Sequence, residues 1–332
     1  YIFNEGNTIA AQANTRNVLQ DKWTMNQAGL LSYGVRLGQV HNLNSYLESH
    51  LMGDPTFHFG SQEEAQLSKV LSSNAKASYW QSLLSQQDPI YQAIALRKLA
   101  EGNTSYSDTL YRYFTTSPYR IVRLQALTLL ADIKDANFLS AVSLALKDEY
   151  EMIARQAAIY VGALGDSSLL PIVAEVLVND KSRMRVNYNL ESDFRVFNKG
   201  KVKESLIAAL AQSNRLNKEE EMKDLEKNFA KVGRMELEIV EVQKREIPLL
   251  ERIDMVRSTR NYNQHEHVDV YLKLLNDDRE AVDLRMAIAE ALGWYTHSPA
   301  RQKIIDNCSV LGKKRIPSPL KEELVQTINR LK

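Results

Sequence analysis

The stretches "YQAIALRKLA" (residues 91–100), "VRLQALTLLA" (122–131) and "ARQAAIYVGA" (154–163) share one pattern, and this pattern decides the fold. Each has a polar or basic residue in second position, followed by apolar residues at the spacing of an α-helix. The second residues are Gln92, Arg123 and Arg155. The pattern therefore recurs after 31 and then 32 residues, which is the length of one repeat of two helices joined by a turn.

Two later segments carry the same pattern, "VKESLIAALA" (202–211) with Lys203 and "LRMAIAEALG" (284–293) with Arg285. Amphipathic runs such as "SDTLYRYFTTSP" (107–118) supply the other helix of each pair. Neither helix can bury its apolar stripe alone, so neighbouring pairs must stack. The sequence predicts a mainly α protein, an α-α superhelix over residues 73–332, with a simple helical bundle as the alternative.

The repeats resemble HEAT-type repeats, whose second helix carries a Val-Arg pair, then Ala, and a final Ala-Leu-Gly. The endings "EALG" (290–293) and "GALGD" (162–166) carry this resemblance. It covers about residues 73–307 and implies a HEAT-like solenoid. Such arrays serve unrelated partners, so the resemblance does not identify a function.

The composition of the 332 residues excludes several classes of protein. With 44% apolar and 25% charged residues the chain is globular, and a net charge of +1 gives no global field that attracts nucleic acid or acidic lipid. No apolar run reaches the roughly 18 residues of a membrane span. A single cysteine, Cys308, excludes an intramolecular disulfide and a thiolate zinc cage.

The repeat breaks between Arg155 and Lys203, where the interval grows to 48 residues. We interpret the extra residues, 181–201, as an inserted loop that combines basic and aromatic side chains. Such a loop could hold an acidic protein segment, or phosphates with stacked bases, which gives nucleic-acid binding as an alternative function. It could also be a solvated loop whose aromatics pack on the next helix pair. The candidate partner-binding residues are Lys181, Arg183, Arg185, Tyr188, Phe194, Arg195, Phe197, Lys199, Lys201 and Lys203.

A second irregular region runs from residue 217 to 257. Its first part predicts an exposed helix of mixed charge. Met235, Leu237 and Ile239 then alternate as in a strand, although the same residues could begin a helix that Pro248 kinks.

Residues that could carry chemistry are few. Cys308 would need a nearby base, and His297 lies eleven residues upstream, so we interpret Cys308 as a small buried apolar residue. His265 and His267 in "HEH" are weak candidates for metal ligands, without an identifiable third ligand; a solvated turn before a helix is the alternative. No glycine-rich phosphate loop occurs, and we expect no cofactor.

The first sixty residues do not follow the repeat pattern. "EGNTIAAQANTRNVLQDKW" (5–23) predicts a helix that opens near Thr8. "LGQVHNLNSYLESHLMGDPTFHF" (37–59) predicts a helix, a turn at Gly53, and a strand over residues 56–59. Gly53 can adopt the left-handed conformation that ends a helix, and Asp54 is interpreted as a turn residue.

These residues resemble the C-terminal end of the catalytic domain of gingipain-like cysteine peptidases. In that family a helix with a "G-x-(Ile)-small-x-A" opening precedes a closing "G-D-P" segment. The matching residues are Gly6, Thr8, Ile9, Ala10 and Ala13, and then Leu51, Met52, Gly53, Asp54, Pro55 and Thr56. The resemblance implies that residues 1–60 are a short α/β remnant of a caspase-like domain, followed by a linker or first helix at 61–72 and the repeats from 73.

The same resemblance implies that this chain is the tail of a larger bacterial protein that is exported, to the periplasm, the cell surface or the medium. The catalytic histidine and cysteine of the family precede its Gly-Asp-Pro segment. Here the only histidines up to Pro55 are His41 and His50, and no cysteine occurs before Cys308, so no catalytic residue is assigned. We expect a non-catalytic interaction or spacer domain, whose partner is another protein or the peptidase domain of the same polypeptide, with nucleic acid disfavoured.

Overall fold

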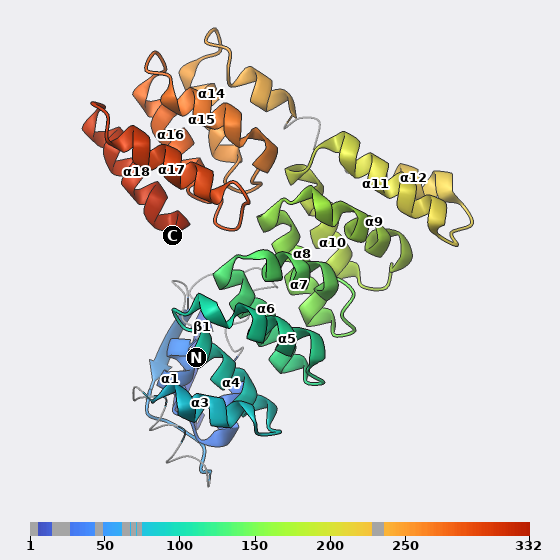
Figure 1. Cartoon of the computed structure of the whole chain (residues 1–332), viewed down its shortest axis with the longest axis vertical. Helices are drawn as coiled ribbons and strands as arrows, with labels where there is room; N and C mark the ends of the chain where they lie inside the picture. The colour runs from blue at the N-terminus through green and yellow to red at the C-terminus, as the bar shows by residue number, and fades with distance from the viewer. Residues whose placement is uncertain are drawn as a thin grey trace. The chain divides into compact units, whose positions relative to one another are not determined.

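The computed structural model describes residues 6–14, 27–43, 49–61, 67, 71, 75–227 and 236–332 (Figure 1). The chain divides into two compact units, Tyr1–Ile133 and Lys134–Lys332. The described residues form many α-helices and one two-stranded sheet. This confirms the predicted mainly α, helical-repeat fold with a small N-terminal α/β part.

The sheet pairs two strands of the N-terminal segment. Strand β1 (Ala10–Asn14) runs antiparallel to β2 (Ser49–Gly53), with Ala10 opposite Gly53. The helix predicted from Thr8 is therefore wrong over residues 10–14, and residues 15–23 of it lie outside the described residues. The helix predicted from residue 37 up to Gly53 is wrong over residues 49–52, which belong to β2. The strand predicted over 56–59 is also wrong, because β2 ends at Gly53.

The Gly-Asp-Pro turn closes this sheet. Gly53 has a φ of +91°, and a Cβ atom there would lie 2.3 Å from the carbonyl oxygen of Ile9, so the position requires glycine. Asp54 Oδ1 accepts a hydrogen bond from the Thr56 amide at 2.8 Å, which confirms its turn role. The carbonyl of Pro55 then accepts from the amide of Gly38 at 2.8 Å and so meets the first turn of α1 (Leu37–Leu43).

Unit 1 continues with two helix pairs. Helix α3 packs against α4, α5 packs against α6, and α4 packs against α6. Leu30 of η1 (Ala28–Tyr33) and Val40 of α1 share a core with Ile94 of α4, so the N-terminal segment folds onto the first pair. The predicted domain boundary near residue 60 lies inside this unit. The helices are α3 (Ala77–Leu84), α4 (Pro89–Ala100), η2 (Thr104–Tyr106), α5 (Ser107–Thr116) and α6 (Arg120–Ile133).

Unit 2 holds the remaining helices. Its first part contains α7 (Ala136–Ala145), α8 (Glu151–Leu164), η3 (Ser167–Leu169), α9 (Leu170–Asn179), α10 (Met184–Asp193), η4 (Phe194–Val196), α11 (Lys199–Gln212) and α12 (Lys218–Glu226). Its second part contains α14 (Leu249–Ser258), η5 (His265–His267), α15 (Val268–Asn276), α16 (Val282–Leu292), α17 (Arg301–Gly312) and α18 (Ser318–Leu331). Residues 236–241 are helical, which settles the ambiguity left by the sequence there.

The recurring second residue ties the two helices of a pair together. Gln92 donates to the carbonyl of Gln86 at 2.7 Å, Arg123 to that of Ser117 at 3.1 Å, and Arg285 to that of Leu275 at 2.9 Å. Each acceptor lies at or just past the C-terminal end of the preceding helix, where carbonyls lack intrahelical donors. Arg252 reaches the carbonyl of Val242 at 2.7 Å in the same way, and this marks a repeat that the sequence pattern did not reveal.

The inserted loop predicted at residues 181–201 is wrong. Residues 184–193 are helix α10, not a loop, and α10 packs against α8 as the second helix of the pair α9–α10. Helix α11 packs against α9, the first helix of that pair, and also contacts α12, so α11 takes the place of the next first helix. Lys203 of α11 accordingly does not reach back to a preceding helix, and it pairs with Glu226 of α12 at 2.7 Å.

The second part of unit 2 has a hydrophobic core of its own. Buried residues from Ile239 to Leu331 form one cluster that includes Tyr295, Ile304 and Cys308. Helices α14, α16 and α18 stack in order within it. Among the residues that the structure describes, no helix has the length and apolarity needed to cross a lipid bilayer.

Candidate functional site

The three aromatic candidates of segment 181–203 separate into two groups. Phe194 and Phe197 are 1% and 5% exposed, because η4 turns them into the core beside the start of α11. Tyr188 on α10 is 61% exposed. The two phenylalanines are therefore structural and are removed from the candidate binding residues, while Tyr188 remains available to a partner.

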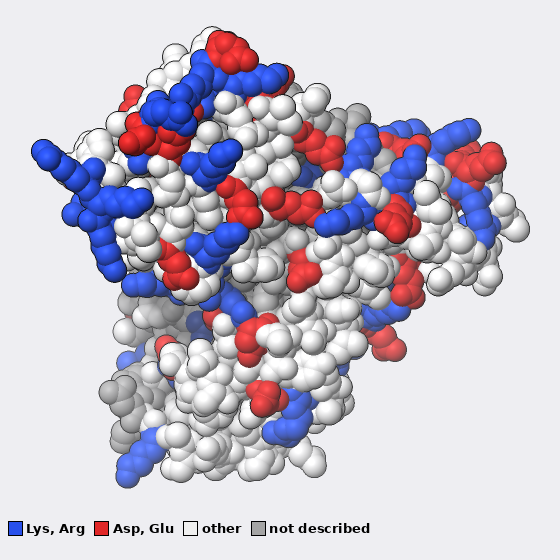
Figure 2. Space-filling view, turned by 45° about the horizontal axis from the view of Figure 1, so that its top comes forward, with Lys and Arg blue, Asp and Glu red and all other residues white. Residues whose placement is uncertain are grey.

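Most of the basic candidates already lie beside an acceptor. The pairs are Lys181 with Glu221, Lys201 with Glu266 and Lys203 with Glu226, with N–O distances between 2.6 and 3.0 Å. Arg183 binds Asp180 and also donates to the carbonyl of Leu146. Apart from a basic group at the left edge, lysine and arginine side chains lie among aspartate and glutamate side chains over the upper part of the face shown in Figure 2. The segment therefore does not form the unbroken basic field that a nucleic-acid backbone requires.

One face of α10 combines apolar exposure with a cation. Met184 and Tyr188 are one helical turn apart and are 79% and 61% exposed, whereas Val186 and Leu190 are buried. The guanidinium carbon of Arg185 lies 4.9 Å from the centre of the Tyr188 ring. We call Met184, Arg185 and Tyr188 the α10 face. The sequence analysis did not include Met184 among the candidate residues. Met184 lies four residues before Tyr188, and on a helix this spacing places both side chains on the same face.

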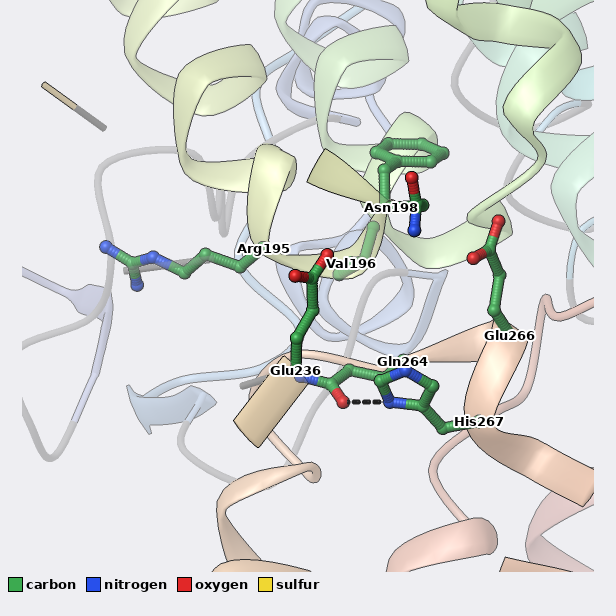
Figure 3. A pocket seen from close by; sticks show the side chains of 8 residues that line it. Arg195, Val196, Asn198, Glu236, Gln264, Glu266 and His267 are labelled. Atoms are coloured by element: carbon green, nitrogen blue, oxygen red, sulfur yellow. Dashed lines mark hydrogen bonds between the residues drawn. The ribbon is translucent and has the colours of Figure 1, made fainter. Parts of the chain in front are cut away.

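A polar pocket lies where the α10–α11 connection meets η5 (Figure 3). The pocket is small, with a cavity volume of about 20 Å³. Its two outer carboxylates are already engaged, since the Lys199 amide donates to Glu236 and the Lys201 ammonium to Glu266. The lining residues are Arg195, Val196, Phe197, Asn198, Glu236, Gln264, Glu266 and His267.

The histidine pair does not form a metal site. Nε2 of His265 lies 3.1 Å from the carbonyl oxygen of Gly162, and Nδ1 lies 2.8 Å from Oγ of Ser298, so both ring nitrogens are engaged. Nδ1 of His267 bonds to the side-chain oxygen of Gln264 (Figure 3). Within the described ranges, no three His, Cys, Asp or Glu side chains come together as a metal site.

Burial lowers the pKa of both histidines. For His265 it lowers the pKa to about 4, although the Gly162 carbonyl and Asp166 oppose the shift. For His267 burial also lowers the pKa, against the charges of Glu266 and Glu236. Both rings are therefore neutral at pH 7.

Cys308 lies in the core of α17 and is fully buried. Burial raises the pKa of its thiol to about 12, so it remains protonated at neutral pH. The ring of His297 packs against those of Phe138 and Tyr160, with centroid distances of 5.9 Å to each. The interpretation of Cys308 as a buried apolar residue is confirmed.

Comparison with known proteins yields no family model and no curated protein that matches this chain. Among solved structures, the chain is similar to human deoxyhypusine hydroxylase in complex with glycerol, at 13% identity over 69% of this chain and 96% of that chain, with a TM-score of 0.29. It is also similar to an engineered protein, at 14% identity over 77% of this chain and 96% of that chain, with a TM-score of 0.28. At TM-scores this low, neither similarity carries a conclusion about this chain.

Proposed function

We propose that this chain is a helical-repeat interaction domain and that its α10 face binds an acidic protein segment with an apolar anchor. The observation that carries the proposal is the exposure of Met184 and Tyr188 on one turn of α10, beside the guanidinium of Arg185. Methionine, tyrosine and arginine are the residue types enriched at the centres of protein interfaces.

The chemistry of the face specifies the kind of partner. Met184 and Tyr188 offer apolar surface to an aliphatic or aromatic side chain. Arg185 favours carboxylates on the approaching segment. The Arg185–Tyr188 stack also fixes the guanidinium before binding, which reduces the entropy lost on association.

A peptide-display selection on the immobilised full chain tests this proposal. Selected sequences should be rich in Asp, Glu and large apolar residues, and their binding should fall at least tenfold on Tyr188→Ala or Arg185→Glu. Leu250→Ala and Arg279→Glu, on exposed residues elsewhere in unit 2, are the matched controls and should bind normally. Selected peptides that bind all four variants equally would overturn the α10 face as the site.

Nucleic-acid binding predicts a different outcome for the same surface. A labelled oligonucleotide should bind at low salt and dissociate steeply as salt increases. The ion pairs of Lys181, Lys201 and Lys203 with glutamates favour the protein partner instead. Micromolar, salt-sensitive binding of an oligonucleotide that Arg185→Glu abolishes would replace the present proposal.

We also propose that this domain is the C-terminal part of an exported, gingipain-like cysteine peptidase, where it acts as an interaction or spacer domain. Support comes from the Gly53–Thr56 turn, in which a positive φ and the Asp54 hydrogen bonds close a sheet. Strand β1 stands where the family pattern has a helix, so the proposal rests on this turn. The peptidase domain of the same polypeptide would then be a second candidate partner.

The intact mass of the protein from its native source tests this origin. A larger mass, with a histidine and a cysteine in the additional sequence that react as a dyad toward an active-site probe, would support it. A native mass equal to that of these 332 residues would end the peptidase proposal and leave the binding proposal unaffected.

A further inference from the structure

Unit 2 consists of two parts that meet through polar and aromatic contacts. We call residues 134–227 the proximal segment and residues 236–332 the distal segment, and the distal segment has its own apolar core. We call the contacts between these segments the joint. The joint contains the pairs His265–Gly162, Glu266–Lys201, Tyr262–Arg195, Glu236–Lys199, and His297 with Phe138 and Tyr160.

His265 makes the closest approach in the joint. A Cβ atom at Gly165 would lie 1.7 Å from the His265 ring, so no other residue at position 165 leaves space for the imidazole. A Cβ atom at Gly162 would lie 2.4 Å from Asp193 Oδ1. At the end of α8, the absence of a side chain at Gly165 therefore leaves room for His265, and its absence at Gly162 leaves room for the side chain of Asp193.

The hydrogen bonds fix which nitrogen of His265 carries the proton. A carbonyl oxygen can only accept, so Nε2 must donate to Gly162, and the neutral ring accepts from the Ser298 hydroxyl at Nδ1. Ser298 Oγ already accepts from the Ala300 amide at 3.1 Å, and Ser298 is 4% exposed. Protonation of Nδ1 would reverse the Ser298 bond, leave the hydroxyl proton without this acceptor, and place a charge in a partly buried site.

We propose that the joint is an acid-sensitive latch, in which protonation of His265 releases the distal segment from the end of α8 while each segment stays folded. The segments can part because the joint contains ion pairs, hydrogen bonds and ring contacts, whereas the distal core lies within residues 239–331. Charge buried at His265 weakens the joint and leaves that core intact.

The charged groups around His265 define the direction of the effect. On the proximal side these are Asp166 after α8, Asp193 at the end of α10, Arg195 in η4 and Lys201 in the first turn of α11. On the distal side they are Glu236, Glu266 and His267. Asp166 favours the imidazolium, but burial outweighs it and lowers the pKa of His265 to about 4. For Asp193, burial raises the pKa, against the Gly162 amide and Arg195. Because the Asp193 carboxyl group is protonated more readily than usual, it offers little negative charge to stabilise a protonated His265.

The sign of the pH dependence follows. A histidine whose pKa is lower in the closed state than in the open state stabilises closure above the open-state value and loses this contribution as pH falls. With an ordinary value of 6.5 and a closed-state value of about 4, the latch should open within that interval. Ser298→Ala removes the donor to Nδ1 and should move the opening to higher pH.

Distance measurement on the full chain tests the latch. Spin labels at Ser140→Cys in α7 and Gln326→Cys in α18, both exposed, report the separation of the segments in a Cys308→Ala background. The distance distribution should shift and broaden between pH 6.5 and 4 while the helical circular dichroism stays constant. His265→Gln, which keeps an N–H donor but cannot be protonated, should remove this transition.

His267→Gln is the matched control, because it removes a neighbouring half-buried histidine whose ring bonds to Gln264 within the distal segment. It should leave the transition of the parent protein unchanged. The latch is overturned if His265→Gln opens at the same pH as the parent protein, if His267→Gln abolishes the transition, or if helical signal and distance are lost together. If His265→Gln proves too unstable, the upward shift expected for Ser298→Ala decides the question, and an unchanged midpoint rejects the proposal.

Discussion

The carboxylate of Asp193 accepts a hydrogen bond from the amide of Gly162 at 3.0 Å, and the two residues are 31 positions apart. This separation equals the interval between the first two repeats in the sequence. The bond therefore joins equivalent levels of two successive second helices, α8 and α10. It identifies α10 as a member of the stack, although its sequence lacks the Ala-Leu-Gly ending.

Gly162→Ala should destabilise unit 2, because the new methyl group would overlap the Asp193 carboxylate. We expect a loss of about 1–3 kcal/mol in unfolding free energy, as for other overpacked sites. Gly312→Ala is the control, since nothing lies within 4 Å of a Cβ atom there. Chemical denaturation of both variants checks the prediction, which fails if the two midpoints coincide.

Arg285→Met should cost far more stability than Lys203→Met, although both residues occupy the same place in the sequence pattern. Arg285 is 4% exposed and donates to the Leu275 carbonyl, so its loss leaves a buried acceptor unpaired at a cost of about 1–3 kcal/mol. The Lys203–Glu226 pair is exposed, and such pairs contribute about 0–1 kcal/mol. Equal losses in urea titrations would contradict the distinction between α16 and α11.

Ala126→Arg should prevent unit 1 from folding. Ala126 on α6 is fully buried, so the longer side chain would bring an unpaired charge into a helix contact. Thr128→Arg, two residues later on the exposed side of the same helix, should fold normally. Thermal unfolding followed by circular dichroism distinguishes the two, and a melting temperature of Ala126→Arg within a degree or two of the parent protein would refute the alignment.

Glu280→Gln should be more damaging than removal of its whole ion pair. Arg252 and Glu280 are 5% and 3% exposed and lie 2.9 Å apart, so neutralising Glu280 leaves a buried cation without its counter-ion, at about 3–5 kcal/mol. The double variant Arg252→Met with Glu280→Gln removes both charges of the pair. A double-mutant cycle should give a loss smaller than the sum of the single substitutions, and strict additivity would show that the pair is not coupled.

Cys308 should resist alkylation in the native protein. Because burial raises the pKa of its thiol to about 12, almost no thiolate exists at pH 8, and the side chain is also inaccessible. Iodoacetamide should modify it only after denaturant is added, as measured by mass spectrometry. Rapid modification of the folded chain would reopen the question of a reactive cysteine.

The repeat pattern predicted the fold because it reports a physical requirement of each pair. Gln92, Arg123 and Arg285 recur because the carbonyls at the end of a first helix need donors, and this need is the same in every repeat. Arg252 answers the same need, but its surroundings lack the small residues that made the other repeats visible in sequence.

The places of α10 and α11 in the stack could not be predicted for a related reason. Residues 202–211 have the local composition of a second helix, and nothing in that composition shows that α11 packs against α9 as a first helix. Strand β1 was missed because Ala10, Ala11 and Ala13 favour a helix locally, whereas pairing with β2 outweighs this preference. The α10 face was only partly visible, since burial of Phe194 and Phe197 depends on the fold around them.

The turn before α16 connects two successive repeats through ion pairs. Glu280 accepts from Arg245 and Arg252 of the preceding repeat, and Arg245 also binds Asp277. A pulling force applied along the chain would thus load two repeats at once, because neither can be extended without stretching this shared anchor. The distal segment should then give way in a single rupture event, rather than unravelling one helix pair at a time.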